Sequence, residues 1–149
     1  MSKSEPSTVI AALRQVVADS YALIGQTHIC HWNVRGPGFF ALHTAFEEQY
    51  TELFAAVDEI AERIRALGAL APGGLANLSE MAGMQEIAED ASAEQMVEHL
   101  ARCNRQLVEH ASTARDLAAG TGDSESEDLM IARIQVHQKH IWMLDSYLG

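Results

Sequence analysis

The chain has 149 residues, two cysteines, 48% hydrophobic residues and a formal net charge of −11 at pH 7. This length suits one domain around one core, and two cysteines are too few for a disulfide framework. The acidic balance disfavours partners that carry phosphate groups, such as nucleic acid or anionic lipid, and it suits cations.

The first two segments of the chain have the apolar periodicity of long helices. Strand signals are nearly absent, whereas apolar residues recur every three or four positions. In the first segment Ile10, Val17 and Ile24 step by seven, and the "RGPG" at 35–38 ends it. The second segment begins at 39 and stops at the "GALAPGG" of 68–74.

Two further helices are expected after a long connection. Ser92 and Gln95 form a capping-box pattern that opens the third helix, which "GTGD" at 120–123 ends. Ser124 and Glu127 repeat the box before the fourth. The connection between 68 and 92 is long enough to run the length of the bundle, and "LANLSEMAGM" within it predicts a short helix.

This pattern predicts an all-α fold: a four-helix bundle with one long crossover that carries a short helix, the ferritin-like arrangement. We expect a single domain over residues 1–149, with residues 1–6 as a short flexible tail. No apolar stretch reaches the roughly eighteen residues of a membrane span. The N-terminus does not read as a signal peptide, so we expect a cytoplasmic protein.

Two histidines fall on the apolar stripes. His31 continues the seven-step series of the first helix, and His43 begins the series of the second. A lone histidine in such a place is usually a core residue. Glu47 lies one turn after His43, on the same face of the helix.

Asp58 and Glu62, further along the second helix, are also four residues apart. Such a pair is as consistent with a solvated face as with a metal site, and Arg63 and Arg65 nearby favour the solvated face. His43 and Asp58 are separated by about 22 Å along the helix, at about 1.5 Å per residue. Either they belong to different sites, or a second subunit in a two-fold pair brings Asp58 and Glu62 to His31 and His43.

The usual di-iron site inside a bundle needs a Glu-x-x-His motif on two helices. None of the seven histidines has a glutamate three residues before it. We therefore expect no such site, and any iron chemistry must take place elsewhere.

The stretches "HWNVRGPGFFALHTAFEEQY" and "VDEIAERIRALG" resemble the Dps proteins (DNA-binding protein from starved cells), the mini-ferritins. The resemblance extends to "APGGLANLSE" and "HQKHIWML" and so covers nearly the whole chain. It implies a hollow homododecamer that stores ferric mineral and protects against oxidative damage. It also implies a ferroxidase that takes Fe(II) and hydrogen peroxide or oxygen as substrates, with peroxide preferred.

The resemblance assigns roles to individual residues of this chain. His31 and His43 match the two histidine ligands, and Glu47 matches an acidic ligand one turn on. Asp58 and Glu62 match carboxylates given by the partner subunit. The implied centre is a di-iron or mono-iron site at the dimer interface, in which Zn or Mn could replace iron. Trp32 matches a tryptophan beside the site, where interception of stray oxidising equivalents and simple packing both fit.

The family has acidic pores near the start of the last helix. Asp123 and Asp128 match the pore aspartates best, and Glu125 and Glu127 match less clearly. Acids at a helix N-terminus also complement the helix dipole, so both interpretations can hold.

The chain departs from the DNA-binding members of the family in one respect. It lacks the lysine-rich terminus that they use, so we expect weak or absent DNA binding. Two alternatives to a ferroxidase cage stay open: a structural stress protein whose interface acids do no redox work, and a nucleoid-compacting protein.

Overall fold

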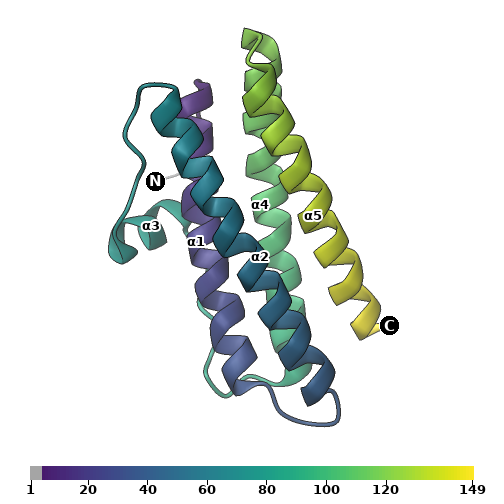
Figure 1. The fold of residues 1–149 in the computed structure, drawn as a ribbon. Coiled ribbons are helices and arrows are strands. Elements are labelled where there is room, and N and C mark those ends of the chain that lie inside the picture. Colours follow the sequence, from purple (N-terminus) through teal and green to yellow (C-terminus); the bar gives the residue numbers. More distant parts are fainter. Residues whose placement is uncertain (1–4) are drawn as a thin grey trace.

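The computed structural model describes residues 5–149, and they form five helices without a strand. Residues 1–4, which belong to the predicted tail, lie outside the described residues. The helices are α1 (Val9–Asn33), α2 (Phe39–Ala66), α3 (Leu75–Ala82), α4 (Ala93–Thr121) and α5 (Ser124–Leu148). The four long helices and the short one in the crossover confirm the predicted all-α bundle (Figure 1).

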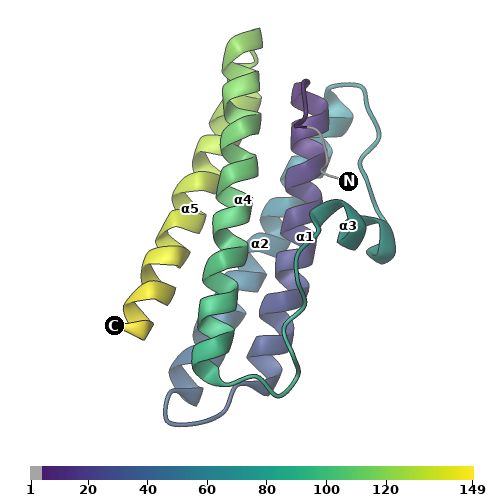
Figure 2. The same cartoon turned by 180° about the vertical axis from the view of Figure 1, so that it is seen from behind.

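The crossover sets the topology of the bundle. α1 and α2 lie side by side as one antiparallel pair, and α4 and α5 form the other (Figure 1). From the end of α2 the chain passes outside α1, places α3 against that helix, and reaches the opposite end of the bundle (Figure 2). α2 and α4 therefore run in the same direction, as a long crossover requires.

The core consists of one apolar stripe from each long helix. Leu13, Phe46, Ile60, Leu107 and Met130 are all fully buried. Burying a side chain of this size contributes about 1.5–3 kcal/mol, so these stripes supply most of the driving force for helix packing. Within residues 5–149, none of the helices combines the length and the apolar character that a membrane crossing requires.

Of the two capping boxes predicted from the sequence, one is confirmed and the other is wrong. Ser92 and Gln95 form the predicted capping box: the Gln95 backbone N–H donates to Ser92 Oγ at 3.1 Å, and the Ser92 N–H donates to Gln95 Oε1 at 2.9 Å. The box predicted for Ser124 and Glu127 is wrong. Asp123 is the N-cap of α5, and its carboxylate accepts from the Ser126 N–H at 3.1 Å.

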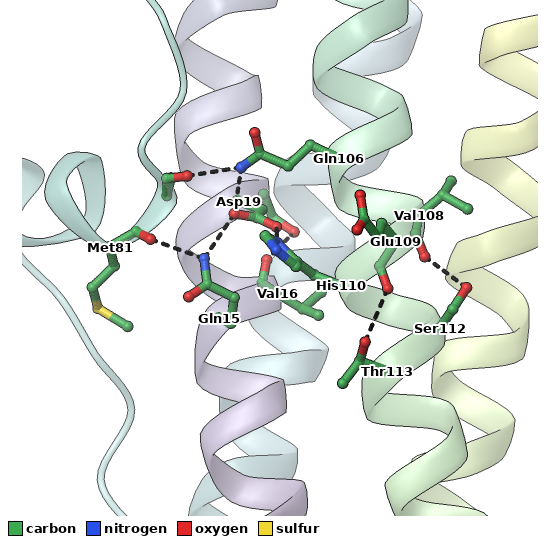
Figure 3. Close-up of polar contacts among 12 residues, drawn as sticks. Gln15, Val16, Asp19, Met81, Gln106, Val108, Glu109, His110, Ser112 and Thr113 are labelled. Carbon is green, nitrogen blue, oxygen red and sulfur yellow. Dashed lines mark hydrogen bonds and ion pairs between the residues drawn. The ribbon is translucent and has the colours of Figure 1, made fainter. Parts of the chain in front are cut away.

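A buried carboxylate ties α1, α4 and the crossover together (Figure 3). Asp19 is fully buried, and Gln15 Nε2 and Gln106 Nε2 donate to its Oδ1 at 3.0 and 3.2 Å. His110 Nδ1 forms an ion pair with Asp19 Oδ2. The two glutamine amides also donate to the carbonyls of Met81 and Ala82, at 2.9 and 2.7 Å. The end of α3 is thus fixed to the bundle through side chains that all meet at one charge.

Candidate metal centre

His31 and His43 face each other where α1 ends and α2 begins. The five-residue turn at 34–38 joins the helices, and Gly36 in it adopts a left-handed φ of 104°. The two imidazole rings are stacked with centroids 3.8 Å apart and planes inclined by 10°. His31 is buried, with 7% of its surface exposed, and His43 is half-buried.

The backbone fixes the tautomer of both rings. His31 Nδ1 lies 2.7 Å from the His43 carbonyl oxygen, and His43 Nδ1 lies 2.7 Å from the His31 carbonyl oxygen. A carbonyl only accepts hydrogen bonds, so each Nδ1 carries the proton and donates it. In the neutral rings each Nε2 then keeps its lone pair, which is the form that binds a metal ion.

Further rings lie beside the histidine pair, and the Phe39 ring stacks on His43 at 4.9 Å. The His28 ring is 3.8 Å from the Trp32 ring and 4.6 Å from the Tyr50 ring. Tyr50 meets the ring of His31 edge-on at 5.3 Å. Trp32, predicted to lie beside the site, is 63% exposed and packs on His28. The Trp32 ring is therefore connected to the histidine pair through His28, whose ring centroid lies 6.3 Å from that of His31.

The predicted carboxylate ligands lie on α2 and are exposed. Glu47 follows His43 by one helical turn, and Asp58 and Glu62 lie in the second half of the helix. Arg63, which we expected to favour a solvated acidic face, turns instead to Asp123, with Nη2 2.8 Å from Oδ1. Over residues 5–149, the structure gives no ion pair or side-chain hydrogen bond to these three acids. Their oxygens are thus available to a ligand.

A single chain does not bring the five predicted ligands together. His31 and His43 meet, but along α2 Asp58 lies about 22 Å and Glu62 about 28 Å from His43. In the described part of the chain, no group of three or more His, Cys, Asp or Glu side chains has the arrangement of a metal site.

Asp58 and Glu62 line a pocket with a volume of about 960 Å³. Exposed apolar side chains share its lining, among them Phe54 at 60% and Leu75 at 76% exposure. Large exposed apolar groups around a few charges are typical of a surface that another protein covers.

A polar network of Glu52, Arg133, His137 and Asn104 lies within the bundle. Arg133 makes two hydrogen bonds to Glu52, at 2.5 and 2.8 Å, and donates to His137 Nε2 at 2.9 Å. His137 Nδ1 donates to Asn104 Oδ1 at 2.8 Å. Both nitrogens of this fully buried ring are therefore occupied, as expected of a structural histidine. Burial, then Arg133 and His140, hold the pKa of His137 well below its ordinary value.

The acids at the start of α5 have unequal surroundings. Burial alone would raise the pKa of Asp123, but hydrogen bonds from Ser126 and the Arg63 guanidinium hold it below its ordinary value. Asp123 thus has a structural task as a helix cap. Asp128 and Glu125 are exposed, and Glu127 is half-buried.

The two cysteines are unreactive thiols within the core. Burial, and then the proximity of Cys103, raises the pKa of Cys30 to about 12. Burial raises the pKa of Cys103 to about 11. Both are free and buried, and since the thiolate is the reactive form, neither side chain is a nucleophile at neutral pH.

Comparison with known proteins places this architecture in a family. The model of the ferritin-like domain matches residues 10–149. "DNA protection during starvation protein 2" of Bacillus anthracis is 36% identical over 141 residues, which cover 95% of this chain and 97% of that protein. The crystal structure of Dps from Staphylococcus aureus superposes with a TM-score of 0.91 at 40% identity, covering 95% of each chain.

A third relative adds a description of its chemistry. The Dps protein of Vibrio cholerae superposes with a TM-score of 0.90 at 30% identity, covering 95% of this chain and 89% of that one. It is described as a member of a broad superfamily of ferritin-like diiron-carboxylate proteins. The chain belongs to the ferritin-like family and, within it, to the Dps proteins.

Proposed function

We propose that the protein is a ferroxidase and iron store. In this proposal Fe(II) is oxidised, preferably by hydrogen peroxide, at sites built across a two-fold interface. The ferric product is stored inside a homododecamer, which protects the cell from oxidative damage. One subunit gives His31, His43 and Glu47, and its partner gives Asp58 and Glu62.

The histidine pair carries this proposal. Each Nδ1 donates its proton to a carbonyl oxygen. In the neutral rings each Nε2 therefore keeps a lone pair with which it can bind a metal ion. The two rings are stacked with centroids 3.8 Å apart, so the pair presents two imidazoles at one place. Imidazole nitrogen with carboxylate oxygen suits Fe(II), and also Zn or Mn in its place.

The pocket at Asp58 and Glu62 supports the partner's part in the site. These acids are exposed, and the apolar side chains around them favour coverage by another protein. A two-fold contact is isologous, so one pairing of subunits would complete two sites at once.

The donor set also indicates the direction of the chemistry. Carboxylates bind iron more strongly as its charge rises, so the ligands favour the ferric product. Two Fe(II) ions supply the two electrons that reduce one peroxide to water or hydroxide without releasing hydroxyl radical. Asp128, and in part Asp123, would draw Fe(II) towards the cavity.

We propose that DNA binding is weak, although the B. anthracis relative is named for DNA protection. Twelve copies at −11 each carry a charge of about −130, which repels phosphates. A salt-sensitive gel shift at physiological ionic strength would contradict this and favour a nucleoid-compacting role.

The decisive experiment is anaerobic stopped-flow oxidation with two Fe(II) per site, started by peroxide. We expect rapid oxidation at about two Fe(II) per peroxide in the wild type. His31→Ala combined with Asp58→Ala should slow it by about 100-fold or more. Glu48→Gln, which changes an exposed acid next to Glu47, is the control. Equal rates in all three proteins, with the assembly intact by ultracentrifugation, would rule out the interface site.

A further inference from the structure

A small pocket between α4 and the crossover brings together a thiol, an imidazole and a thioether. Cys103, His99 and Met84 all line this pocket, whose volume is about 240 Å³. His99 and Cys103 lie one turn apart on α4, with Cys103 Sγ 3.5 Å from His99 Nε2. Met84 lies in the segment that follows α3. Three side chains that can each donate an electron pair to a metal ion therefore border one space.

The hydrogen bonds of His99 fix its tautomer. Gln26 Oε1 accepts a hydrogen bond from the Ile87 N–H at 2.8 Å and lies 2.9 Å from His99 Nε2. An amide oxygen only accepts hydrogen bonds, so His99 Nε2 carries the proton and Nδ1 keeps its lone pair.

The Nδ1 atom of His99 is an unused donor at the pocket. Within residues 5–149 this atom makes no hydrogen bond, and it is not enclosed in the core. Only 5% of the surface of His99 is exposed, so Gln26 holds a nearly buried ring in place. Its lone pair is therefore available to an ion that enters the pocket.

Burial determines which charge the pocket accepts. Burial, and then Arg102, lowers the pKa of His99, so the ring is neutral at neutral pH. Burial raises the pKa of Cys103 to about 11, although Arg102 acts against this shift. An isolated thiolate is unfavourable there, whereas a thiolate bound to a monovalent cation forms a neutral pair. A neutral pair costs less to bury than the net positive charge that a divalent cation would leave.

We propose that Cys103, His99 and Met84 form a binding site for a soft monovalent metal ion, Cu(I). Thiolate and thioether sulfur select Cu(I) over harder cations. The ion takes the place of the Cys103 proton, which is released, and the oxidation state of copper does not change. The described residues offer no third His, Cys, Asp or Glu ligand here, which disfavours Zn. The site shares no residue with the proposed ferroxidase centre and does not depend on it.

The test is an anaerobic titration of the reduced, metal-free assembled protein with Cu(I), in competition with the chelator bathocuproine disulfonate. We expect about one Cu(I) per subunit, with sulfur and nitrogen neighbours in X-ray absorption spectra. Because binding releases a proton, the affinity should fall about tenfold for each pH unit between pH 8 and pH 7. A site built from neutral imidazoles alone would show no such dependence in this range.

Matched variants identify the ligands. Cys103→Ala should lose the site, whereas Cys30→Ala removes a fully buried thiol that does not line the pocket and should bind as the wild type. Met84→Leu should weaken binding several-fold, and Met143→Leu, which changes an exposed methionine, is its control. His99→Gln should also weaken binding and remove the nitrogen neighbour.

Ultracentrifugation checks that each variant assembles, and Cys103→Ser, which preserves the side-chain volume, decides the matter if Cys103→Ala does not. If the wild type binds Cu(I) no more tightly than the Cys103 variant, the inference is wrong. It is also wrong if binding is lost in His31→Ala combined with Asp58→Ala, since the ion would then lie in the proposed ferroxidase centre. Neither result would bear on iron oxidation, which the peroxide assay measures separately.

Discussion

His110 and Asp19 are paired between α4 and α1, and the charges around them make this contact depend on pH. The hydrogen bond to Asp19, followed by the charges of Asp19, Glu109 and Glu5, outweighs burial and raises the pKa of His110. His110 lines a surface pocket together with Glu5, Glu109 and Glu80. Because the folded pKa exceeds the unfolded one, the stabilisation is complete below the unfolded pKa of about 6.5. It is lost as the pH rises through the folded pKa.

Because this stabilisation is lost as the pH rises, we predict that the thermal midpoint falls above neutral pH. His110→Gln should remove part of the fall in thermal midpoint between about pH 6.5 and pH 8.5, an effect of about 2–4 °C. His99, His137 and His140 have lowered pKa values, so their contributions change only as the pH falls below about 6.5.

Scanning calorimetry of the assembled protein across this range would measure the difference. Thr113→Ala, which alters a residue of the same pocket without a titrating group, is the control. If the thermal midpoint of His110→Gln falls with pH as steeply as that of the wild type, the pair does not contribute to the pH dependence.

Sequence reasoning located the histidine pair but missed its supporting interactions. The seven-residue step placed His31 and His43 on inward faces, and the short turn between helices brought them near each other. The hydrogen bond of each Nδ1 to the opposite carbonyl depends on how the two helix ends pack against each other. The apolar periodicity of the sequence contains no information on that packing. The same holds for Asp19 and His110, which are 91 positions apart in sequence.

At the scale of the helix, the start of α5 shows how a cap is selected. The stretch "GDSESE" contains an aspartate and a serine in adjacent positions, and either residue type is a strong N-cap. The fold selects Asp123 because Arg63 of α2 reaches its carboxylate, and Arg63 Nε also donates to Ser126 Oγ at 3.0 Å. A tertiary contact therefore decided between two locally equivalent caps.

This choice can be tested by substitution. Asp123→Ala should lower the free energy of unfolding by about 1 kcal/mol or more, since it removes a cap and an ion pair. Asp123→Asn keeps the acceptor and should cost less. Ser124→Ala should change stability by no more than about 0.5 kcal/mol.

Thermal midpoints of the three variants, compared at one protein concentration, would order them. If Ser124→Ala lowers the thermal midpoint as much as Asp123→Ala does, then Ser124 is the cap, as the sequence predicted.

At the scale of the whole molecule, the crossover was the most informative prediction from the sequence. Glycine and proline marked where α2 ends, and the length of the following segment required a connection along the bundle. The bundle centre was predictable only in part: the missing Glu-x-x-His motifs argued against a di-iron site. The ion pair of Arg133 with Glu52, which lies there, joins residues 81 positions apart.

The separation of the histidines from Asp58 and Glu62 along one helix has a genetic consequence. Under the proposed two-fold site, a His31→Ala subunit paired with an Asp58→Asn subunit carries one doubly defective site and one intact site. Neither variant alone should oxidise iron rapidly, yet their mixture should recover about a quarter of the wild-type activity if subunits pair at random.

Co-expression of the two variants followed by the peroxide assay would measure this recovery, with His31→Ala and His43→Ala co-expressed as the control. Those two lesions fall on the same half of the site and should not rescue each other. Complementation between alleles would thus divide the residues of one helix hairpin into two functional groups, one for each side of the dimer.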